Sequence, residues 1–141
     1  MKINVKKLHP DAVIPTKATV GSAGFDLFST VEVIVPPGLS SIVGIGLSFE
    51  IPCGYFMSLL GRSGMAFKYD IISPTGTIDS DYRGEVKVKL FNLDHYNELH
   101  INPGDRIAQA VILPVPEVEF IEVEELTDTV RGAGGFGSTG K

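Results

Sequence analysis

Short β-prone runs separated by glycine and proline constrain the fold of this chain more than any other feature. Sixteen glycines and nine prolines are spread over 141 residues, and the runs between them are rich in valine, isoleucine and phenylalanine. Only residues 64–69 have a helical character. Many short strands joined by turn residues are typical of antiparallel all-β proteins. The sequence therefore predicts an all-β sandwich or barrel with one short α-helix.

Alternation of apolar and polar residues places the individual strands. Gly44 and Gly46 lie inside a long apolar run and indicate a bulge or a close approach of two backbones. Ser63 is expected to cap the helix at 64–69. The expected strands span residues 2–8, 21–29, 31–35, 40–51, 55–60, 77–78, 86–90, 98–101, 106–113 and 118–123.

Size and hydropathy favour one domain with a sizeable core. The chain has a mass of 15.1 kDa and is 43% hydrophobic. No apolar run approaches the ~20 residues that a membrane span needs, and the first ten residues lack the apolar segment of a secretory signal. We expect a soluble cytoplasmic protein with no membrane partner, the nucleus or a virion being the alternative locations.

Charge and metal-ligand content exclude several classes of function. The net charge is −5 and the pI is near 5.1. Proteins that mainly bind nucleic acid instead have clusters of lysine and arginine that contact the phosphate backbone. A single cysteine, Cys53, excludes an internal disulfide framework and a cysteine zinc site. A small anionic substrate would have to be held by locally concentrated arginines, by backbone N–H groups or by a metal cation.

The most informative stretch covers residues 76–92, GTIDSDYRGEVKVKLFN. Its β-branched start and its alternating end indicate two strands, and the segment between them, with Gly84 at its exit, favours a tight turn. The stretch therefore predicts a β-hairpin that presents Asp79 and Tyr82 near its tip. Loops on rigid scaffolds often carry functional residues, although an aspartate that merely forms the turn is the alternative for Asp79.

Four further polar residues need an explanation. Asp26 and Gln109 each interrupt an apolar strand, and a buried polar group needs a hydrogen-bond partner. That partner is either the protein itself or a ligand. Arg62 directly precedes the expected helix, whose first N–H groups can bind an anion, and an ordinary surface ion pair is the alternative. Arg106 is expected to form a structural pair with Asp105.

The last eleven residues, RGAGGFGSTGK, have five glycines and no apolar periodicity. Such a segment is expected to be mobile until it binds something. Its glycines allow backbone N–H groups to converge on phosphate, with Arg131, Ser138 and Thr139 as further donors. Phe136 has no core to enter and could stack on a planar base. An ordinary glycine-rich linker is the alternative.

Five segments of the chain together resemble a known family. In order they read AGFDLFS, GRSGMAFK, GTIDSDYRGEVKVKLFN, PGDRIAQAVI and RGAGGFGSTGK, and they resemble the five motifs of the homotrimeric dUTP pyrophosphatases, the dUTPases. The resemblance covers residues 23–141. It implies a distorted jelly-roll of antiparallel strands with one short helix over residues 1–130. It also implies a homotrimer whose active sites are shared between subunits, each closed by a C-terminal arm, residues 131–141.

The resemblance implies hydrolysis of dUTP to dUMP and pyrophosphate by in-line attack of water on the α-phosphorus. This reaction limits uracil in DNA and supplies dUMP. Asp79 is similar to the catalytic residue that deprotonates the water. Magnesium would be the cofactor, held mainly by the triphosphate, with Asp26 supporting its hydration shell. Tyr82 would lie beneath the deoxyribose.

The other residues that the resemblance identifies would bind the substrate. Main-chain groups of residues 73–78 would pair with the uracil edge, although Pro74 has no N–H to donate. Phe136 would cover the uracil, and the other arm residues would surround the γ-phosphate. The substrate-binding set that the resemblance implies is Arg62, Ser63, Gly64, Ser73, Gly76, Thr77, Ile78, Tyr82, Gln109, Arg131, Phe136, Gly137, Ser138 and Thr139.

Two alternatives are open at this point. A dCTP deaminase or bifunctional deaminase of the same fold would carry a catalytic glutamate in the strand that here contains Lys87 and Lys89, and would lack this arm. A dUTPase-like regulatory protein that binds another protein is the second alternative. The intact Asp79, Tyr82 and arm favour catalysis.

Overall fold

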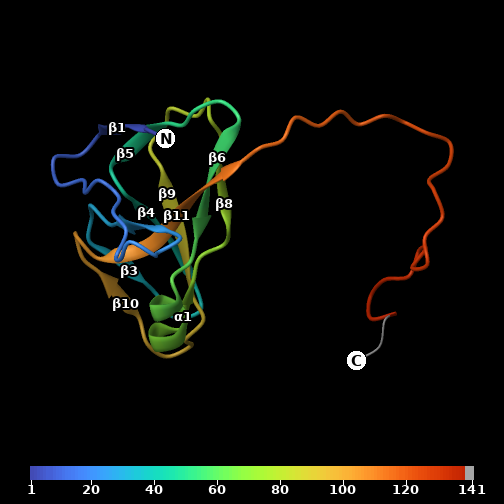
Figure 1. Ribbon diagram of the computed structural model, residues 1–141. Helices are drawn as coiled ribbons and strands as arrows, with labels where there is room; N and C mark the ends of the chain where they lie inside the picture. Colours follow the sequence, from blue (N-terminus) through green and yellow to red (C-terminus); the bar gives the residue numbers. More distant parts are fainter. Residues whose placement is uncertain (139–141) are drawn as a thin grey trace.

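The computed structural model describes residues 1–138 (Figure 1). These residues form mainly short strands and one α-helix, α1 (Ser63–Tyr69), as the sequence predicts. The strands are β1 (Asn4–Lys7), β2 (Phe25–Phe28), β3 (Val33–Val35), β4 (Ser40–Gly44), β5 (Leu47–Glu50), β6 (Tyr55–Leu60), β7 (Ile71–Ile72), β8 (Gly76–Ile78), β9 (Lys87–Asn92), β10 (Leu99–Ile101) and β11 (Arg106–Pro114).

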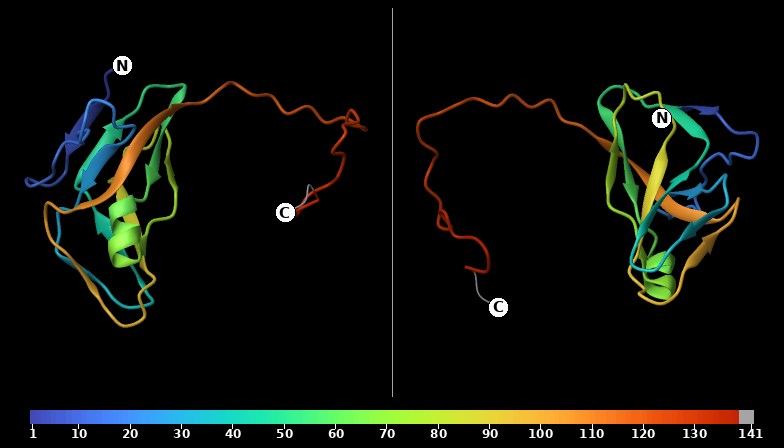
Figure 2. Two further views of the ribbon diagram at one scale, coloured as in Figure 1. Left: turned by 60° about the horizontal axis from the view of Figure 1, so that its bottom comes forward. Right: turned by 180° about the vertical axis from the view of Figure 1, so that it is seen from behind.

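All strand pairs of the described residues are antiparallel. The largest sheet has the order β2-β11-β6-β8, and a second sheet has the order β4-β9-β7. The pairs β1-β5 and β10-β3 complete the body (Figures 1 and 2). The predicted all-β jelly-roll fold with one short helix is confirmed. Within residues 1–138 no helix has both the length and the apolar character that a bilayer span requires.

The core is one cluster that draws apolar side chains from both larger sheets. On β9, Val88 and Leu90 are buried and alternate with exposed Lys87 and Lys89, which is the period-two pattern of a half-buried strand. Leu27 on β2 and Ile107 on β11 are also fully buried. Each such side chain contributes about 1.5–3 kcal/mol by leaving water, so this cluster provides the rigid support for the loops around it.

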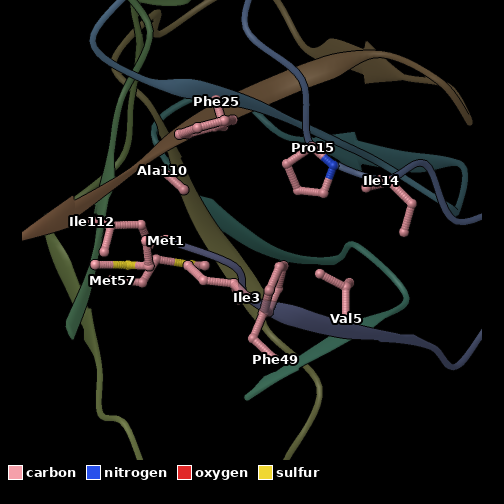
Figure 3. Close-up of a pocket in the computed structure, with 10 residues that line it drawn as sticks. All are labelled: Met1, Ile3, Val5, Ile14, Pro15, Phe25, Phe49, Met57, Ala110 and Ile112. Carbon is pink, nitrogen blue, oxygen red and sulfur yellow. The ribbon is translucent and has the colours of Figure 1, made fainter. Parts of the chain in front are cut away.

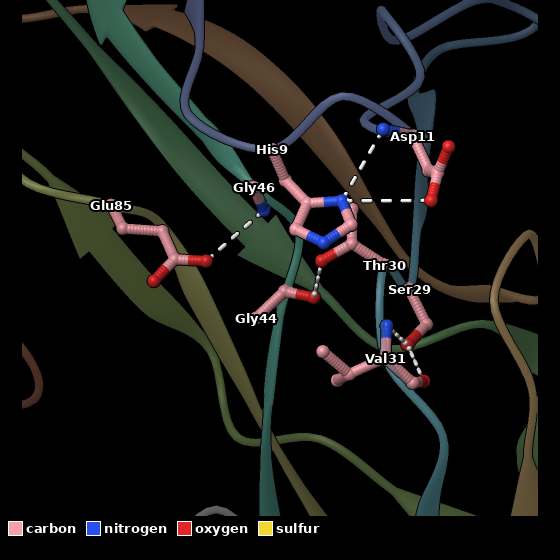
Figure 4. A network of polar contacts seen from close by, with 8 residues as sticks. All are labelled: His9, Asp11, Ser29, Thr30, Val31, Gly44, Gly46 and Glu85. Carbon is pink, nitrogen blue, oxygen red and sulfur yellow. Dashed lines mark hydrogen bonds and ion pairs between the residues drawn. The ribbon is translucent and has the colours of Figure 1, made fainter.

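The apolar run at 40–51 is two strands rather than one. Gly46 lies between β4 and β5 with a φ of +64°, which favours glycine. A Cβ at Gly46 would lie 2.7 Å from the Cβ of His9. The Leu8 N–H donates to the Gly46 carbonyl at 2.8 Å, so the predicted close approach of two backbones is present. The Glu85 carboxylate accepts a hydrogen bond from the Gly46 N–H at 3.1 Å (Figure 4). The break lets β4 pair with β9 while β5 pairs with β1.

The prediction of a β-hairpin at residues 76–92 is wrong. Strand β8 pairs with β6, and β9 pairs with β4 and β7, so these two strands belong to different sheets. The segment between them, residues 79–86, crosses from one sheet to the other. Alternation indicates that a segment is extended but not which strand it pairs with, because pairing depends on chain segments far away in the sequence.

The strand predicted at 118–123 is absent from the described residues. After β11 the chain leaves the body in an extended path (Figures 1 and 2). Phe120 is 96% exposed, and Val118 and Ile121 are exposed as well. A β-strand requires a neighbouring backbone, and this segment pairs with none among residues 1–138.

The helix begins one residue earlier than predicted. Arg62 occupies the N-cap position with extended backbone angles, and Ser63 is the first helical residue, without a side-chain capping bond. The Met65 and Ala66 N–H groups donate to the Arg62 carbonyl at 3.1 Å. The cap position therefore presents a guanidinium instead of a hydroxyl.

Candidate active site

A polar cavity of about 280 Å³ opens where β2, β11 and the connection from β6 to α1 meet. We call it the arginine cavity. It brings together five of the residues that the sequence singled out, although they lie up to 83 positions apart in the chain. Its lining residues are Ala18, Ser22, Ala23, Gly24, Asp26, Arg62, Ser63, Gly64, Arg106 and Gln109.

A β-bulge in β11 explains why two of its side chains reach the same cavity. Arg106 and Gln109 are three residues apart and would face opposite sides of a regular strand. The register against β2 shifts between Arg106 and Ala108, however, and Gln109 then pairs directly with Asp26. The extra residue turns Arg106 to the cavity side. Ile107 and Ala108 are fully buried.

Asp26 lies between two arginines in the arginine cavity. Its carboxylate is 3.3 Å from Arg62 Nε and 3.4 Å from an Arg106 guanidinium nitrogen, and its side chain is 15% exposed. The expected pair of Arg106 with Asp105 is wrong, because Asp105 instead accepts a hydrogen bond from the Asn102 N–H at 2.8 Å. Two permanent positive charges thus face one carboxylate, so the cavity has an excess of positive charge that suits a polyanion.

Gln109 is held by a backbone carbonyl, which was one of its two expected partners. Its side-chain amide donates to the Gly61 carbonyl at 3.0 Å. A Cβ at Gly24 would lie 2.5 Å from Gln109 Oε1, so only glycine leaves room for the amide in this position. Gly24 therefore sets the position of Gln109 on the cavity wall.

Gly24→Ala is expected to weaken binding of inorganic tripolyphosphate by about tenfold, because the methyl group displaces Gln109 and costs about one hydrogen bond. Isothermal titration calorimetry measures this affinity. Gly21→Ala is the matched control, since a Cβ there meets no atom within 4 Å, and it should bind as the wild type does. Equal affinity in both variants would contradict the role of Gly24.

A second group of predicted residues lies on β8 and the segment after it. Gly76, Thr77 and Ile78 form β8 and pair with residues 57–59 of β6. Asp79 follows the strand and is exposed. The Tyr82 N–H donates to the Asp79 carbonyl at 3.2 Å, which closes a turn.

Contacts outside the predicted set keep this turn in shape. The Tyr82 hydroxyl donates to the Glu85 carbonyl at 3.1 Å. Arg83 donates to the Ser80 carbonyl at 2.7 Å and to the Tyr82 carbonyl at 3.1 Å. The buried Ser48 hydroxyl of β5 donates to the Arg83 carbonyl at 2.8 Å. The sequence carried no signal for Ser48, because its role depends on a contact 35 residues away.

The predicted residues fall into three separate groups within one chain. Neither Asp79 nor Tyr82 lines the arginine cavity as formed by residues 1–138, and Tyr82 is 45% exposed. Arg131, Phe136, Gly137 and Ser138 lie on the segment that leaves the body (Figure 2). Ser73 lies against Gly61. Thr139 lies outside the described residues.

A second cavity, of about 230 Å³, has a different chemistry (Figure 3). Its side chains are all apolar, so it offers no side chain for binding phosphate or for acid-base catalysis. It is lined by Met1, Ile3, Val5, Ile14, Pro15, Phe25, Phe49, Met57, Ala110 and Ile112. The arginine cavity is therefore the better candidate for a phosphorylated ligand.

An antiparallel β fold with a cavity of two arginines, a carboxylate and an amide defines a protein of the class that handles small phosphorylated molecules. A family model described as dUTPase matches residues 10–140. The chain belongs to the dUTPase family, as its five motifs predicted.

Individual relatives are similar to this chain over all or nearly all of its length. A deoxyuridine 5'-triphosphate nucleotidohydrolase from Nautilia profundicola is 56% identical over the full length of both chains. One from Helicobacter pylori strain J99 is 45% identical, covering 99% of this chain and 97% of the relative. Among solved structures, the dUTPase of Staphylococcus bacteriophage 80alpha with dUPNHPP has a TM-score of 0.94 at 29% identity and covers 99% of each chain.

A further solved structure concerns metal binding. A mutant dUTPase from phage phi11 of S. aureus, described with a structural Mg(II) ion, has a TM-score of 0.84 at 27% identity. It covers 89% of this chain and 98% of the phage chain.

Proposed function

We propose that the chain hydrolyses dUTP to dUMP and pyrophosphate, with water attacking the α-phosphorus. Membership of the dUTPase family over nearly the whole chain carries this conclusion. The arginine cavity supports it, because its charge and its hydrogen-bond donors suit a triphosphate.

The arginine cavity binds the phosphates. Arg62 supplies a planar, permanently charged donor, and Ser63 and Gly64 open α1, where the first N–H groups have no partner within the helix. Gln109 contributes its amide. Held by these donors, the triphosphate is fixed relative to the attacking water, and such positioning lowers the entropic part of the barrier.

Asp79 acts as the general base. Asp79 follows β8 on a turn that is tied to β5 through Arg83 and Ser48, so the backbone that carries its carboxylate is held by the rigid body. The carboxylate accepts the proton of the attacking water, and no covalent nucleophile is required. Cys53 and the serines therefore need no part in the chemical step.

The backbone around β8 recognises uracil, and Tyr82 supports the deoxyribose. Donors and acceptors of residues 73–78 pair with the uracil edge. Cytosine would leave these groups unpaired, and a site built on hydrogen bonds discriminates strongly against such an analogue. Tyr82 excludes a ribose because its ring leaves no room for a 2′-hydroxyl.

Magnesium fits the arginine cavity only as an ion that the substrate carries. Within residues 1–138 no three or more His, Cys, Asp or Glu side chains cluster as metal ligands. Asp26 is the one carboxylate that lines the cavity, and magnesium typically uses one or two carboxylates together with substrate phosphates. Bound in this way, the ion would neutralise charge on the pyrophosphate leaving group. Asp26 would accept hydrogen bonds from its hydration shell.

The complete active site is shared between the subunits of a homotrimer. Three observations on residues 1–138 support this assembly. The arginine cavity, the Asp79 turn and the described part of the arm are separate, Asp79 and Tyr82 are exposed, and the segment 118–123 pairs with no strand in this part of the chain. The arm, residues 131–141, closes over the nucleotide, with Phe136 over the uracil and Arg131, Gly137, Ser138 and Thr139 near the phosphates.

Pyrophosphate release tests the proposed function. With magnesium present, we expect activity on dUTP and none above background on dCTP, dTTP or UTP, because each of these differs at the uracil edge, at the 5-methyl group or at the sugar. Ammonia release from dCTP would instead identify a deaminase. That result would contradict the proposal, as would equal rates on UTP and dUTP.

A further inference from the structure

We propose that Arg106 is a second phosphate-binding arginine of the active site and contacts the substrate directly. The identity of the ligand as a triphosphate rests on the proposed function. The motif comparison assigned phosphate binding to Arg62, Ser63, Gly64 and Gln109, and the sequence favoured a structural role for Arg106. The geometry of the arginine cavity points to the additional role.

The two arginines differ in how far their side chains are exposed. Arg62 Nε lies 3.3 Å from the Asp26 carboxylate as an ion pair, an Arg62 guanidinium nitrogen donates to the Arg106 carbonyl at 2.9 Å, and the Arg62 side chain is 24% exposed. The Arg106 guanidinium has one polar contact among the described residues, with Asp26 at 3.4 Å, and the Arg106 side chain is 50% exposed. A guanidinium has five N–H groups. Arg106 therefore presents more of its side chain to a ligand than Arg62 does.

A β-bulge in the backbone directs Arg106 to the arginine cavity, and the bulge sacrifices local hydrogen bonds of the strand. Without the bulge between Arg106 and Ala108, the Arg106 side chain would face away from the cavity side that Gln109 occupies. A bulge gives up regular ladder hydrogen bonds, and bulges commonly re-aim a side chain beside an active site. A pair with Asp26 alone would not require the side chain to be this exposed.

The charge of the arginine cavity gives an independent reason to assign phosphate binding to Arg106. Asp26 offsets the charge of one arginine, so a cavity with Arg62 alone would be close to neutral. A triphosphate carries several negative charges and binds at a site with excess positive charge. Arg106 supplies that excess. The bidentate geometry of a guanidinium on phosphate oxygens also exceeds what a lysine can offer.

Binding of α,β-imido-dUTP, which is not hydrolysed at the α,β-bond, tests the proposal by calorimetry with the full chain and magnesium. Arg106→Gln should weaken binding by about tenfold to a hundredfold, since it removes charge-assisted hydrogen bonds. Arg106→Lys should recover part of the loss. Binding of dUMP, which has a single phosphate, should change less. Lys68→Gln, at the exposed last turn of α1, removes the same charge outside the cavity and should bind as the wild type does.

A double variant separates direct contact from an effect through Asp26. If Arg106 touches phosphate, Asp26→Asn with Arg106→Gln should bind the analogue more weakly than Asp26→Asn alone. Equal affinity of these two proteins would overturn the proposal, as would wild-type affinity in Arg106→Gln. Circular dichroism checks that each variant is folded, and Arg106→Lys provides the comparison if Arg106→Gln is not.

The result is distinguishable from failure of the proposed function. A wild-type protein that binds the analogue through Arg106 but releases no pyrophosphate from dUTP would refute the activity and leave the Arg106 contact standing. A protein that hydrolyses dUTP at the wild-type rate and affinity after Arg106→Gln would refute the contact alone.

Discussion

Asp79→Asn is expected to lower kcat for dUTP hydrolysis by about a hundredfold to ten-thousandfold, the usual contribution of a positioned general base. Asparagine keeps the size and the turn-forming character of aspartate, but its amide cannot accept the proton of the attacking water. KM should change little, because the proposed phosphate site is the arginine cavity, which Asp79 does not line among the described residues. Steady-state pyrophosphate release with magnesium measures both constants.

Asp81→Asn is the matched control for this prediction. Asp81 lies on the same turn, two residues further on, and lines a different cavity together with Ser80 and Arg83. The same change of charge at this position should leave kcat near the wild-type value. A variant at Asp79 that retains a tenth of the wild-type kcat would show that another group accepts the proton.

Removal of residues 131–141 is expected to abolish turnover while the protein remains folded. Among residues 1–138 the core cluster and the side chains packed against it end at Ile112, so the truncation removes no core side chain of this part of the chain. In the proposed function the lost arm carries the donors for the γ-phosphate and the Phe136 ring over the uracil, and a closing segment also excludes water from the site. Pyrophosphate release measures turnover.

Thermal unfolding and size-exclusion chromatography serve as the control for the truncation. The shortened chain should unfold within a few degrees of the full chain and elute as the same assembly. Loss of the folded state or of the assembly on truncation would mean that the arm is structural. Full turnover without the arm would remove its proposed role in catalysis.

Local features of the fold could be predicted from the sequence because they depend on residues that are neighbours in the chain. Alternation placed most strands to within a few residues, and glycine marked the close approach at Gly46. Polar residues in apolar strands drew attention to Asp26 and Gln109, and the structure places both in the arginine cavity. The five motifs led to the dUTPase family because their joint order and spacing are far more specific than any single motif.

The errors share one physical cause. The predicted hairpin, the strand at 118–123 and the pair of Arg106 with Asp105 each required a partner, and partners are chosen by segments distant in the chain. Strand β8 pairs with β6 instead of β9. Arg106 reaches Asp26, 80 residues away, through a bulge that no local pattern announces.

The sequence by itself determined the strand-rich architecture, the short helix, the family and the residue types of the candidate site, because periodicity and motif order are properties of the chain read in one dimension. Tertiary structure alone decided which strands pair, that Gln109 and Arg106 share a cavity wall, and that Asp79 stands apart from the arginine cavity. Those outcomes follow from packing one core and satisfying backbone hydrogen bonds across the whole chain.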